Sequence, residues 1–328
     1  MRRTLKALTL LALIGLVIGG GGFLYVQAKV QAPGSHDLDV RVRIEPGSGV
    51  SAIAAQLHDE GLVSNGLLVR LWARYSGQHT RLRAGEYEVP AHASIAQVLT
   101  LLESGKTYVR KLTLPEGLTV TEAMLVIQDA EGLTGEVTHI PGDGEMLPET
   151  YHYAWGDTRA DLVARMTADM AALVQTQWVA RADGFVLKSP RELVTLASIV
   201  EKETGIAAER PQVAGVFLNR LRKGMRLQSD PTVVYALTNG SGALGRALTR
   251  DDLKIDSPYN TYRVKGLPPA PIANPGRDSL LAVMNPAVTD ALYFVADGSG
   301  GHVFARTLDE HNRNVAKWRK FKSQSLGK

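Results

Sequence analysis

The sequence predicts an α+β protein with an N-terminal transmembrane helix, a small α+β module and a larger mixed α/β domain. Three observations lead to this prediction: an uncharged apolar stretch at residues 7–26, short segments in which hydrophobic and polar residues alternate, and longer segments with hydrophobic residues at helical spacing. With 328 residues, of which 45% are hydrophobic, the chain is long enough to bury two cores.

The composition excludes several classes of function. The formal net charge is only +4, and the lysines and arginines are scattered rather than gathered in a stripe, so no nucleic-acid partner is expected. The chain has no cysteine, which excludes a disulfide framework, a thiol nucleophile and cysteine-ligated zinc, and suits a location outside the cytoplasm. Because the eight histidines show no HExxH-like spacing, we expect neither a metal nor another cofactor.

Residues 7–26 read ALTLLALIGLVIGGGGFLYV and contain no charged side chain. Their number matches the roughly 20 residues that cross a bilayer as a helix. Arg2, Arg3 and Lys6 precede the stretch, and Asp37 is the first acidic residue. The positive-inside rule therefore predicts a single-pass protein of the inner (cytoplasmic) membrane, with residues 1–28 forming a cytoplasmic stub and the span, and the remainder in the periplasm. A cleaved signal peptide and a buried core helix are the alternatives.

Residues 29–39 are polar, contain a Pro-Gly-Ser turn and are predicted to form a linker. A small α+β module is expected at residues 40–112. Its patterns predict, in order, a strand, two short helices, a strand, a third helix and a closing strand, over VRVRI, VSAIAAQL, GLLVRLW, GEYEV, IAQVLTLL and VRKLT. This unit resembles the LysM-like module of one murein-enzyme family, and a spacer that binds no glycan fits the pattern equally.

Residues 113–328 are predicted to form the second domain. One helix is expected between Thr119 and Ile140, and a longer one from Arg159 to Val174. The sequence SPRE at residues 189–192 is a capping box with proline at the first helical position, so a further helix begins there.

The phase of that helix places one carboxylate on its apolar face. At about 100° per residue, the hydrophobic residues of LVTLASIV share one arc, and Glu203 falls within roughly 20° of Leu196 at its middle. Glu201 lies about 140° from Leu196, on the polar side. Burial disfavours the charged form and raises a carboxyl pKa, which makes a glutamate a proton donor at neutral pH, as cleavage of a glycosidic bond requires.

The helix phase alone leaves a second interpretation open. If the helix ends by Thr204, Glu203 is exposed, or it pairs with an arginine such as Arg210, Arg220 or Arg226.

The blocks ASIVEKETG, ERPQVAGVFLNRLRKGMRLQSDPTVVY, PYNTY, GLPPAPIANPG and YFVADGSGGHVF closely resemble the MltG/YceG-like family of endolytic murein transglycosylases, in the family's order and spacing. The resemblance runs from about residue 40 to the C-terminus and implies a YceG-like catalytic domain at residues 113–328. It also implies that the second glutamate of EKET, Glu203, is the catalytic residue. Thr204 is similar to the hydroxyl residue that follows the catalytic glutamate in other lytic transglycosylases.

The same blocks supply candidates for substrate binding, each with a structural alternative. Asn219 and Arg220 lie at the end of a helix, where an exposed solubilising pair is as plausible as a substrate contact. Asp230, which precedes a proline, and Asn274 could each serve as a helix cap instead. The complete set of candidates is Asn219, Gln228, Asp230, Tyr259, Asn260, Thr261, Tyr262 and Asn274. For the PYNTY loop the alternative is a rigid turn that bonds to itself, and His302 is interpreted as structural.

The resemblance implies cleavage of the β-1,4 bond between N-acetylmuramic acid and N-acetylglucosamine within nascent glycan strands, with formation of 1,6-anhydro ends that terminate elongation. Glu203 would act first as acid and then as base. The expected partners are peptidoglycan strands, the inner membrane and, through the family, peptidoglycan synthases of elongation or division. Two rivals stand beside this reading: a lysozyme-like hydrolase that uses Glu201, Asp230 or Asp256 to activate water, and a glycan-binding scaffold without activity.

Overall fold

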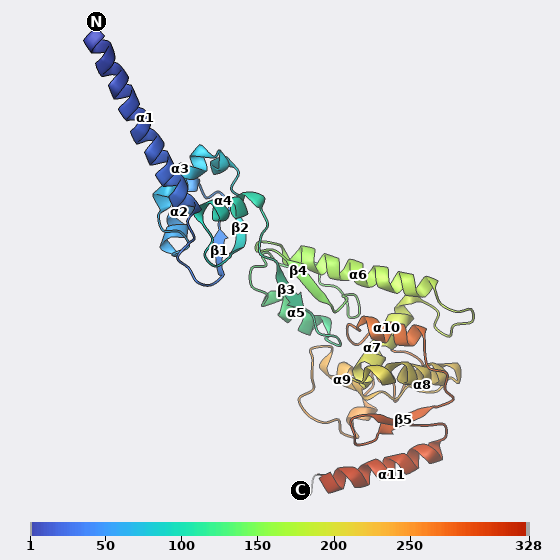
Figure 1. Cartoon of the computed structure of the whole chain (residues 1–328). Helices are drawn as coiled ribbons and strands as arrows, with labels where there is room; N and C mark the ends of the chain where they lie inside the picture. Colours follow the sequence, from blue (N-terminus) through green and yellow to red (C-terminus); the bar gives the residue numbers. More distant parts are fainter. Residues whose placement is uncertain (1, 326–328) are drawn as a thin grey trace. The chain divides into compact units, whose positions relative to one another are not determined.

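The computed structural model describes residues 2–325. It divides the chain into two compact units (Figure 1). The first runs to Arg110 and includes Ala154–Gly156; the second contains Lys111–Tyr153 and the chain from Asp157 onward.

The N-terminal helix α1 (Arg2–Gln31) is long and apolar enough to cross a membrane, with a mean hydropathy of 2.1 over its most apolar part. The leucines of this part are exposed, so α1 is not a buried core helix. It ends later than predicted, because Val26 packs against the core of the first unit and Val30, one turn further, is fully buried in that core. Residues 29–31 are therefore helix rather than linker.

The residues after α1 are also held to the first unit. The amide of Gly34 donates a hydrogen bond of 3.0 Å to the carbonyl of His92, and the amide of His92 donates one of 2.9 Å to the carbonyl of His36. The predicted linker at residues 29–39 is thus wrong, because its first part continues a helix and its second part is hydrogen-bonded to the unit that follows.

The first unit packs three helices on a two-stranded antiparallel sheet. Its elements are β1 (Val40–Ile44), α2 (Val50–Asp59), α3 (Gly66–Tyr75), β2 (Gly85–Val89) and α4 (Ile95–Ser104). Val40 pairs with Val89 and Ile44 with Gly85. Val42, Ile44 and Tyr87 are buried together with hydrophobic residues of the helices.

The predicted closing strand does not belong to this sheet. Residues Arg110–Thr113 form β3, which pairs with β4 (Thr150–Tyr153) in the second unit. Leu112 and Leu114 lie in a hydrophobic cluster of that unit together with residues of α5 (Val120–Gln128) and α6 (Arg159–Val179). The hydrophobic residues of the strand therefore find their partners after it in the chain rather than before it.

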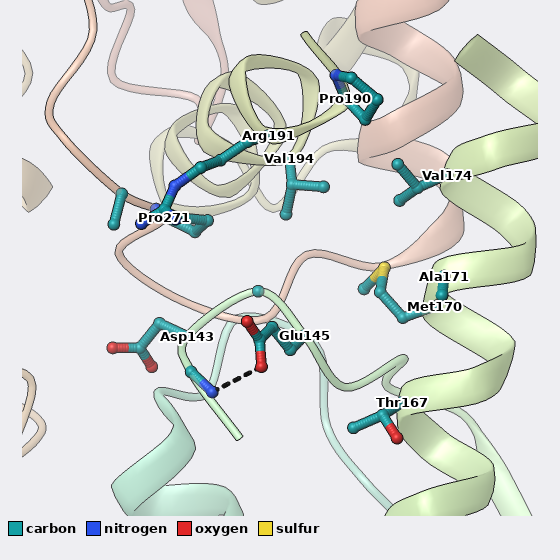
Figure 2. A pocket seen from close by; sticks show the side chains of 13 residues that line it. Asp143, Glu145, Thr167, Met170, Ala171, Val174, Pro190, Arg191, Val194 and Pro271 are labelled. Carbon is teal, nitrogen blue, oxygen red and sulfur yellow. Dashed lines mark hydrogen bonds between the residues drawn. The ribbon is translucent and has the colours of Figure 1, made fainter. Parts of the chain in front are cut away.

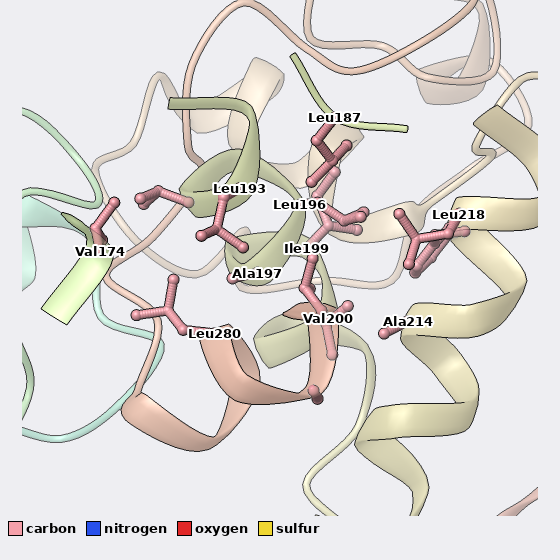
Figure 3. Packing of buried hydrophobic residues seen from close by; sticks show 14 of the residues in the cluster. Val174, Leu187, Leu193, Leu196, Ala197, Ile199, Val200, Ala214, Leu218 and Leu280 are labelled. Atoms are coloured by element: carbon pink, nitrogen blue, oxygen red, sulfur yellow. The ribbon is translucent and has the colours of Figure 1, made fainter. Parts of the chain in front are cut away.

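The larger cluster of the second unit surrounds α7 (Pro190–Glu203), which packs against α6, α8 (Arg210–Arg222), α9 (Asp230–Thr238) and α10 (Arg277–Met284). Every residue from Leu193 to Val200 is buried. Figure 3 shows Leu193 and Val200 of α7 between Leu280 of α10 and Leu218 of α8. Since α7 is enclosed on all sides, its position in the unit is fixed along most of its length.

The chain ends in a hairpin and a helix. The strands β5 (Tyr293–Ala296) and β6 (His302–Ala305) pair antiparallel as a hairpin across a glycine-rich turn. The terminal helix α11 (Leu308–Ser325), which the sequence analysis did not predict, packs against this hairpin. Three short 3-10 helices complete the described elements, at Gln78–Thr80, Ala207–Glu209 and Asp252–Lys254.

Candidate active site

Glu203 is the last residue of α7. The helix begins as predicted: Ser189 Oγ accepts from the amide of Glu192 at 3.2 Å, although the Glu192 carboxylate accepts from the amide of Lys188 rather than from that of Ser189. It ends because Thr204 adopts an extended conformation (φ −141°, ψ 128°). Glu203 is therefore held by a rigid, buried helix, while its own side chain is only partly buried.

Ser229 is the immediate partner of Glu203. Its hydroxyl donates a hydrogen bond of 2.5 Å to Glu203 Oε1, and the residue is 1% exposed. Within residues 2–325, this is the one side chain hydrogen-bonded to the Glu203 carboxyl. Sequence reasoning missed Ser229, although it lies between two chosen candidates, Gln228 and Asp230, because the contact joins residues 26 positions apart.

The surroundings of Glu203 set its protonation. Burial raises the pKa of the Glu203 carboxyl to about 7, against the hydrogen bond from Ser229 and the positive charges of His302 and Arg220, which favour the carboxylate, while the negative charge of Asp230 disfavours it. A carboxyl with a pKa near 7 is present in both forms at neutral pH. It can donate a proton and then accept one.

Ser229 is held in place by a network of backbone and hydroxyl groups. Its amide donates to Thr261 Oγ1 at 3.0 Å, and its carbonyl accepts from Thr232 Oγ1 at 2.7 Å. The preceding residue, Gln228, has a left-handed backbone (φ 54°), and its amide donates to the carbonyl of Thr261. A non-glycine residue in this conformation costs energy that the surrounding bonds must offset, which is common beside functional groups.

Arg220 fixes the segment that leads to Ser229. Its guanidinium is largely buried and donates through Nη1 to the carbonyls of Arg226 (3.1 Å) and Leu227 (2.8 Å) and to the side chain of Gln228 (3.2 Å). Through Nε it also donates to the carbonyl of Leu292 at 2.6 Å. The interpretation of Arg220 as an exposed solubilising residue is therefore wrong, because these four acceptors require it to point inward.

The alternative pairing of Glu203 with an arginine is not observed. Arg210 bonds to other carboxylates, and Arg220 acts on Glu203 through its charge while its hydrogen bonds go to other acceptors. Asn219 lies beside Arg220, and its amide donates to the carbonyls of Thr289 and Ala291. Its side chain thereby attaches α8 to the segment before β5.

Asp230 and Tyr262 form a second polar pair close to Glu203. The Tyr262 hydroxyl donates to Asp230 Oδ1 at 2.6 Å. Burial, followed by the hydrogen bond to Asp230, raises the pKa of Tyr262. Asp230 is exposed and is the first residue of α9, whose N-cap is Ser229 and not Asp230. These two side chains and the exposed Gln228 lie next to the residues that hold Ser229, and each is at least partly exposed.

The other residues of the PYNTY loop build its frame. Asn260 is fully buried, and its amide donates to the carbonyls of Leu253 and Ile255. Thr261 is also fully buried and bonds to Ser229 and Thr232, while Tyr259 packs on Tyr235 with ring centroids 4.8 Å apart. The PYNTY loop is therefore a rigid turn, which is the alternative given for it above, and the side chain of Tyr262 is partly exposed.

Asn274 is fully buried as well. Its Oδ1 accepts from the amides of Gly144 (3.0 Å) and Met146 (3.1 Å), and its Nδ2 donates to the carbonyl of Leu118. The expected cap is wrong, because α10 starts at Arg277 with Gly276 as N-cap. The buried amide instead joins two loops far apart in the sequence.

The side chain of Glu201 is not exposed to solvent. Its side chain is 6% exposed, with Oε1 3.1 Å from Arg210 Nη2 and Oε2 accepting from the amide of Gly276 at 2.9 Å. Arg210 also pairs with Glu116 at 3.1 Å. The predicted polar side of the helix is thus wrong, because α7 is covered on that side by α10 and the start of α8. Asp256, the third carboxylate considered for a hydrolase, is exposed.

A further polar contact lies directly after α7. Glu209 Oε2 is 2.7 Å from His302 Nδ1, Glu209 Oε1 accepts from the amide of His302, and Thr204 Oγ1 donates to Glu209 at 3.4 Å. Burial acts to raise the pKa of Glu209, but the hydrogen bonds from His302 outweigh it and lower the pKa overall. His302 therefore ties β6 to the end of α7.

A cavity of about 540 Å³ lies toward the opposite end of α7 (Figure 2). Met170 and Val174 of α6 and Val194 of α7 line its apolar side. Its carboxylates are engaged: Glu145 accepts from the amide of Gly142, and Asp143 accepts from Tyr235. Since Glu203 does not line this cavity, we do not assign it to the active site.

Comparison with known proteins agrees with this arrangement. The model of the YceG-like family matches residues 42–317. An endolytic murein transglycosylase from Bacillus subtilis is 33% identical, over 92% of this chain and 91% of that protein. One from Streptococcus pneumoniae is 31% identical, over 94% of this chain but only 64% of that protein. The crystal structure of a yceG-like protein from Listeria monocytogenes superimposes with a TM-score of 0.53 at 30% identity, covering 84% of this chain and 98% of the other. The chain belongs to the YceG-like family.

Proposed function

We propose that this protein is an endolytic murein transglycosylase with Glu203 as its catalytic acid and base. It cleaves the β-1,4 bond between N-acetylmuramic acid and N-acetylglucosamine within glycan strands. The observation that carries the proposal is a partly buried carboxyl with a pKa of about 7, fixed by Ser229 at the end of a buried helix. The names of the Bacillus subtilis and Streptococcus pneumoniae relatives support the same reaction.

The geometry suits a reaction that uses one carboxyl group twice. Ser229 occupies Oε1 of Glu203, which leaves Oε2 to carry the proton. The protonated carboxyl donates to the bridging oxygen as the bond from the muramic C1 breaks. The resulting carboxylate then accepts the proton of the C6 hydroxyl, whose oxygen bonds to C1 and closes the 1,6-anhydro ring. Proton and electron pairs balance without water, and the proton taken from the C6 hydroxyl regenerates the acid.

Contacts to the sugar are proposed for Gln228, Asp230 and Tyr262. All three lie within the loops that hold Ser229, and their polar groups suit hydroxyl and acetamido groups. A hydrolase would need a second carboxylate to act on water. Glu201 is bonded to Arg210 and Gly276, which leaves Asp230 and Asp256 for a hydrolytic mechanism, and of these Asp230 is the one whose charge acts on Glu203.

We further propose that α1 holds the protein in the inner membrane with its N-terminus in the cytoplasm and both units in the periplasm. The cationic residues before the span and the late first acidic residue support this orientation. The first unit, with its order of strand, two helices and strand, is proposed to be the LysM-like module of the family. Such an anchor would suit an enzyme that cuts nascent strands beside a peptidoglycan synthase, because enzyme, strand and synthase would then be held at the same membrane.

Mass spectrometry of the products tests the proposal. Uncrosslinked glycan strands are incubated with the wild-type full chain, with Glu203→Gln and with a matched control. The control, Glu136→Gln, changes an exposed residue of the same unit. Internal products with 1,6-anhydro ends from the wild type and the control, and none from Glu203→Gln, are expected. Reducing ends would indicate a hydrolase, and intact strands that still bind the protein would indicate a scaffold.

A further inference from the structure

Helix α3 of the first unit carries an exposed hydrophobic stripe. Leu67, Leu71 and Tyr75 follow one another at four-residue spacing and are 52%, 49% and 68% exposed. Arg70 and Arg74 flank the stripe and are also exposed. The opposite side of the helix is buried in the core of the unit. An exposed stripe of large apolar side chains with arginines along one edge is typical of helices that lie at a membrane surface.

The stripe lies beside the N-terminal helix. The rings of Phe23 and Tyr75 meet edge to face with centroids 5.3 Å apart, and Tyr75 also contacts Trp72 at 5.5 Å. Val30 of α1 is fully buried in the same core as α3. The two helices therefore belong to one body, which Figure 1 shows as α1 running into the unit next to α3.

The depth of this contact follows from the length of the span. If residues 7–26 cross the bilayer, Phe23 lies three residues inside the outer end, about 5 Å along the helix axis. Tyr75 contacts Phe23 and must lie at a similar depth. Tyr25 and Trp72 lie close by, and Lys29 places its ammonium 5.8 Å from the Tyr25 ring. Aromatic rings followed by cations are what the boundary between lipid and water favours.

We propose that α3 is embedded in the periplasmic interface of the bilayer that α1 crosses, with Leu67, Leu71 and Tyr75 among the acyl chains and Arg70 and Arg74 at the lipid phosphates. This rests on the proposed membrane anchor. Helices of this kind insert about 5–10 Å into the boundary between headgroups and acyl chains. The first unit is then held to the membrane at two places rather than by a single helix.

Spin labels in the full chain, reconstituted in phospholipid bilayers, test the inference. The chain has no cysteine, so single labels are introduced at Leu71→Cys, at Leu125→Cys as the control on the second unit, and at Leu16→Cys within the span. Leu125 is 58% exposed, which matches Leu71. Collisions of each label with oxygen, which enters lipid, and with a water-soluble nickel complex are measured by electron paramagnetic resonance.

The ratio of oxygen to nickel collisions at Leu71 is expected to be several-fold above that at Leu125 and to approach that at Leu16. A water-like ratio at Leu71 with a lipid-like ratio at Leu16 would overturn the placement of α3 while leaving the anchor intact. A water-like ratio at Leu16 would overturn the anchor and the inference together. Protection of Leu71 from both reagents, with spin–spin coupling, would assign the stripe to a second copy of the chain instead.

Discussion

The hydroxyl of Ser229 donates a hydrogen bond of 2.5 Å to Oε1 of Glu203, and it does so from a loop whose backbone is fixed by Arg220 and Thr261. The bond stabilises the carboxylate form, while burial stabilises the acid. The pKa of Glu203 near neutrality is the balance of these two effects, so each of them can be tested separately.

Removing the Ser229 hydroxyl is expected to raise the pKa of Glu203 further. A hydrogen bond to a charged group contributes about 1.5–3 kcal/mol, which corresponds to about 1–2 pKa units. Because the proposed mechanism requires a protonated Glu203 in its first step, the alkaline limb of the kcat/KM profile of Ser229→Ala should move to higher pH. Ser241→Ala, which alters an exposed hydroxyl of the same unit, should leave the limb in place. A shift of the limb to lower pH would contradict this account.

Glu203→Gln is expected to abolish activity and yet to stabilise the second unit at alkaline pH. The folded-state pKa of about 7 exceeds the ordinary value of 4.5, so the native state binds the proton more tightly than the unfolded state. The stabilisation that the Glu203 proton gives to the folded wild type is therefore fully present below about pH 4.5 and is lost as the pH rises through 7.

Glutamine lacks this titration. The unfolding free energy of Glu203→Gln should equal that of the wild type at pH 4.5 and exceed it by about 1–3 kcal/mol at pH 8, measured by urea unfolding. The control Glu136→Gln should show no such dependence on pH. A gain of equal size at both pH values would mean that packing, and not ionisation, separates the two proteins.

Arg220→Lys is expected to impair both stability and activity. A lysine cannot satisfy the four acceptors that the guanidinium serves, and a loss of about 2–4 kcal/mol in unfolding free energy is expected. Because the segment before Ser229 loses its support, kcat should also fall about tenfold or more at temperatures where the variant is folded. Arg222→Lys, on the exposed side of α8, is the matched control. Wild-type kcat in folded Arg220→Lys would exclude the positioning role.

The two glutamates of EKET are expected to respond in opposite ways. Glu201→Gln weakens the bonds to Arg210 and Gly276 and should lower the unfolding free energy by about 1–3 kcal/mol. The folded variant should still release 1,6-anhydro products at a rate within a few-fold of wild type. Thermal unfolding and product analysis on the same samples check both statements, and loss of product chemistry in the folded variant would reassign Glu201 to the reaction.

The local features of the site could be predicted from the sequence more accurately than its long-range contacts. The start of α7 and the inward phase of Glu203 followed from capping and periodicity, which are properties of neighbouring residues. The same phase argument misplaced Glu201, because it assumes that one side of a helix faces water, whereas α7 is covered on every side. Periodicity describes one helix at a time and cannot reveal how many neighbours it has.

Partners distant in the chain escaped prediction for a related reason. Ser229, the inward direction of Arg220 and the buried amide of Asn274 depend on contacts between loops whose geometry no local pattern encodes. Likewise, the strand at Arg110–Thr113 was recognised as a strand, but its partner β4 lies further along the chain. The stripe of α3 was visible as hydrophobic spacing, and only its exposure distinguishes it from a core-facing one.

The burial of Val30 has a mechanical consequence. A membrane helix joined to its domain by a flexible tether can tilt while the domain keeps its orientation. Here the end of α1 is part of the core of the first unit, so the two must rotate together. Membrane helices adjust their tilt to the thickness of the surrounding bilayer. If α1 spans the membrane as proposed, a change in bilayer thickness that tilts α1 therefore tilts the first unit by the same angle.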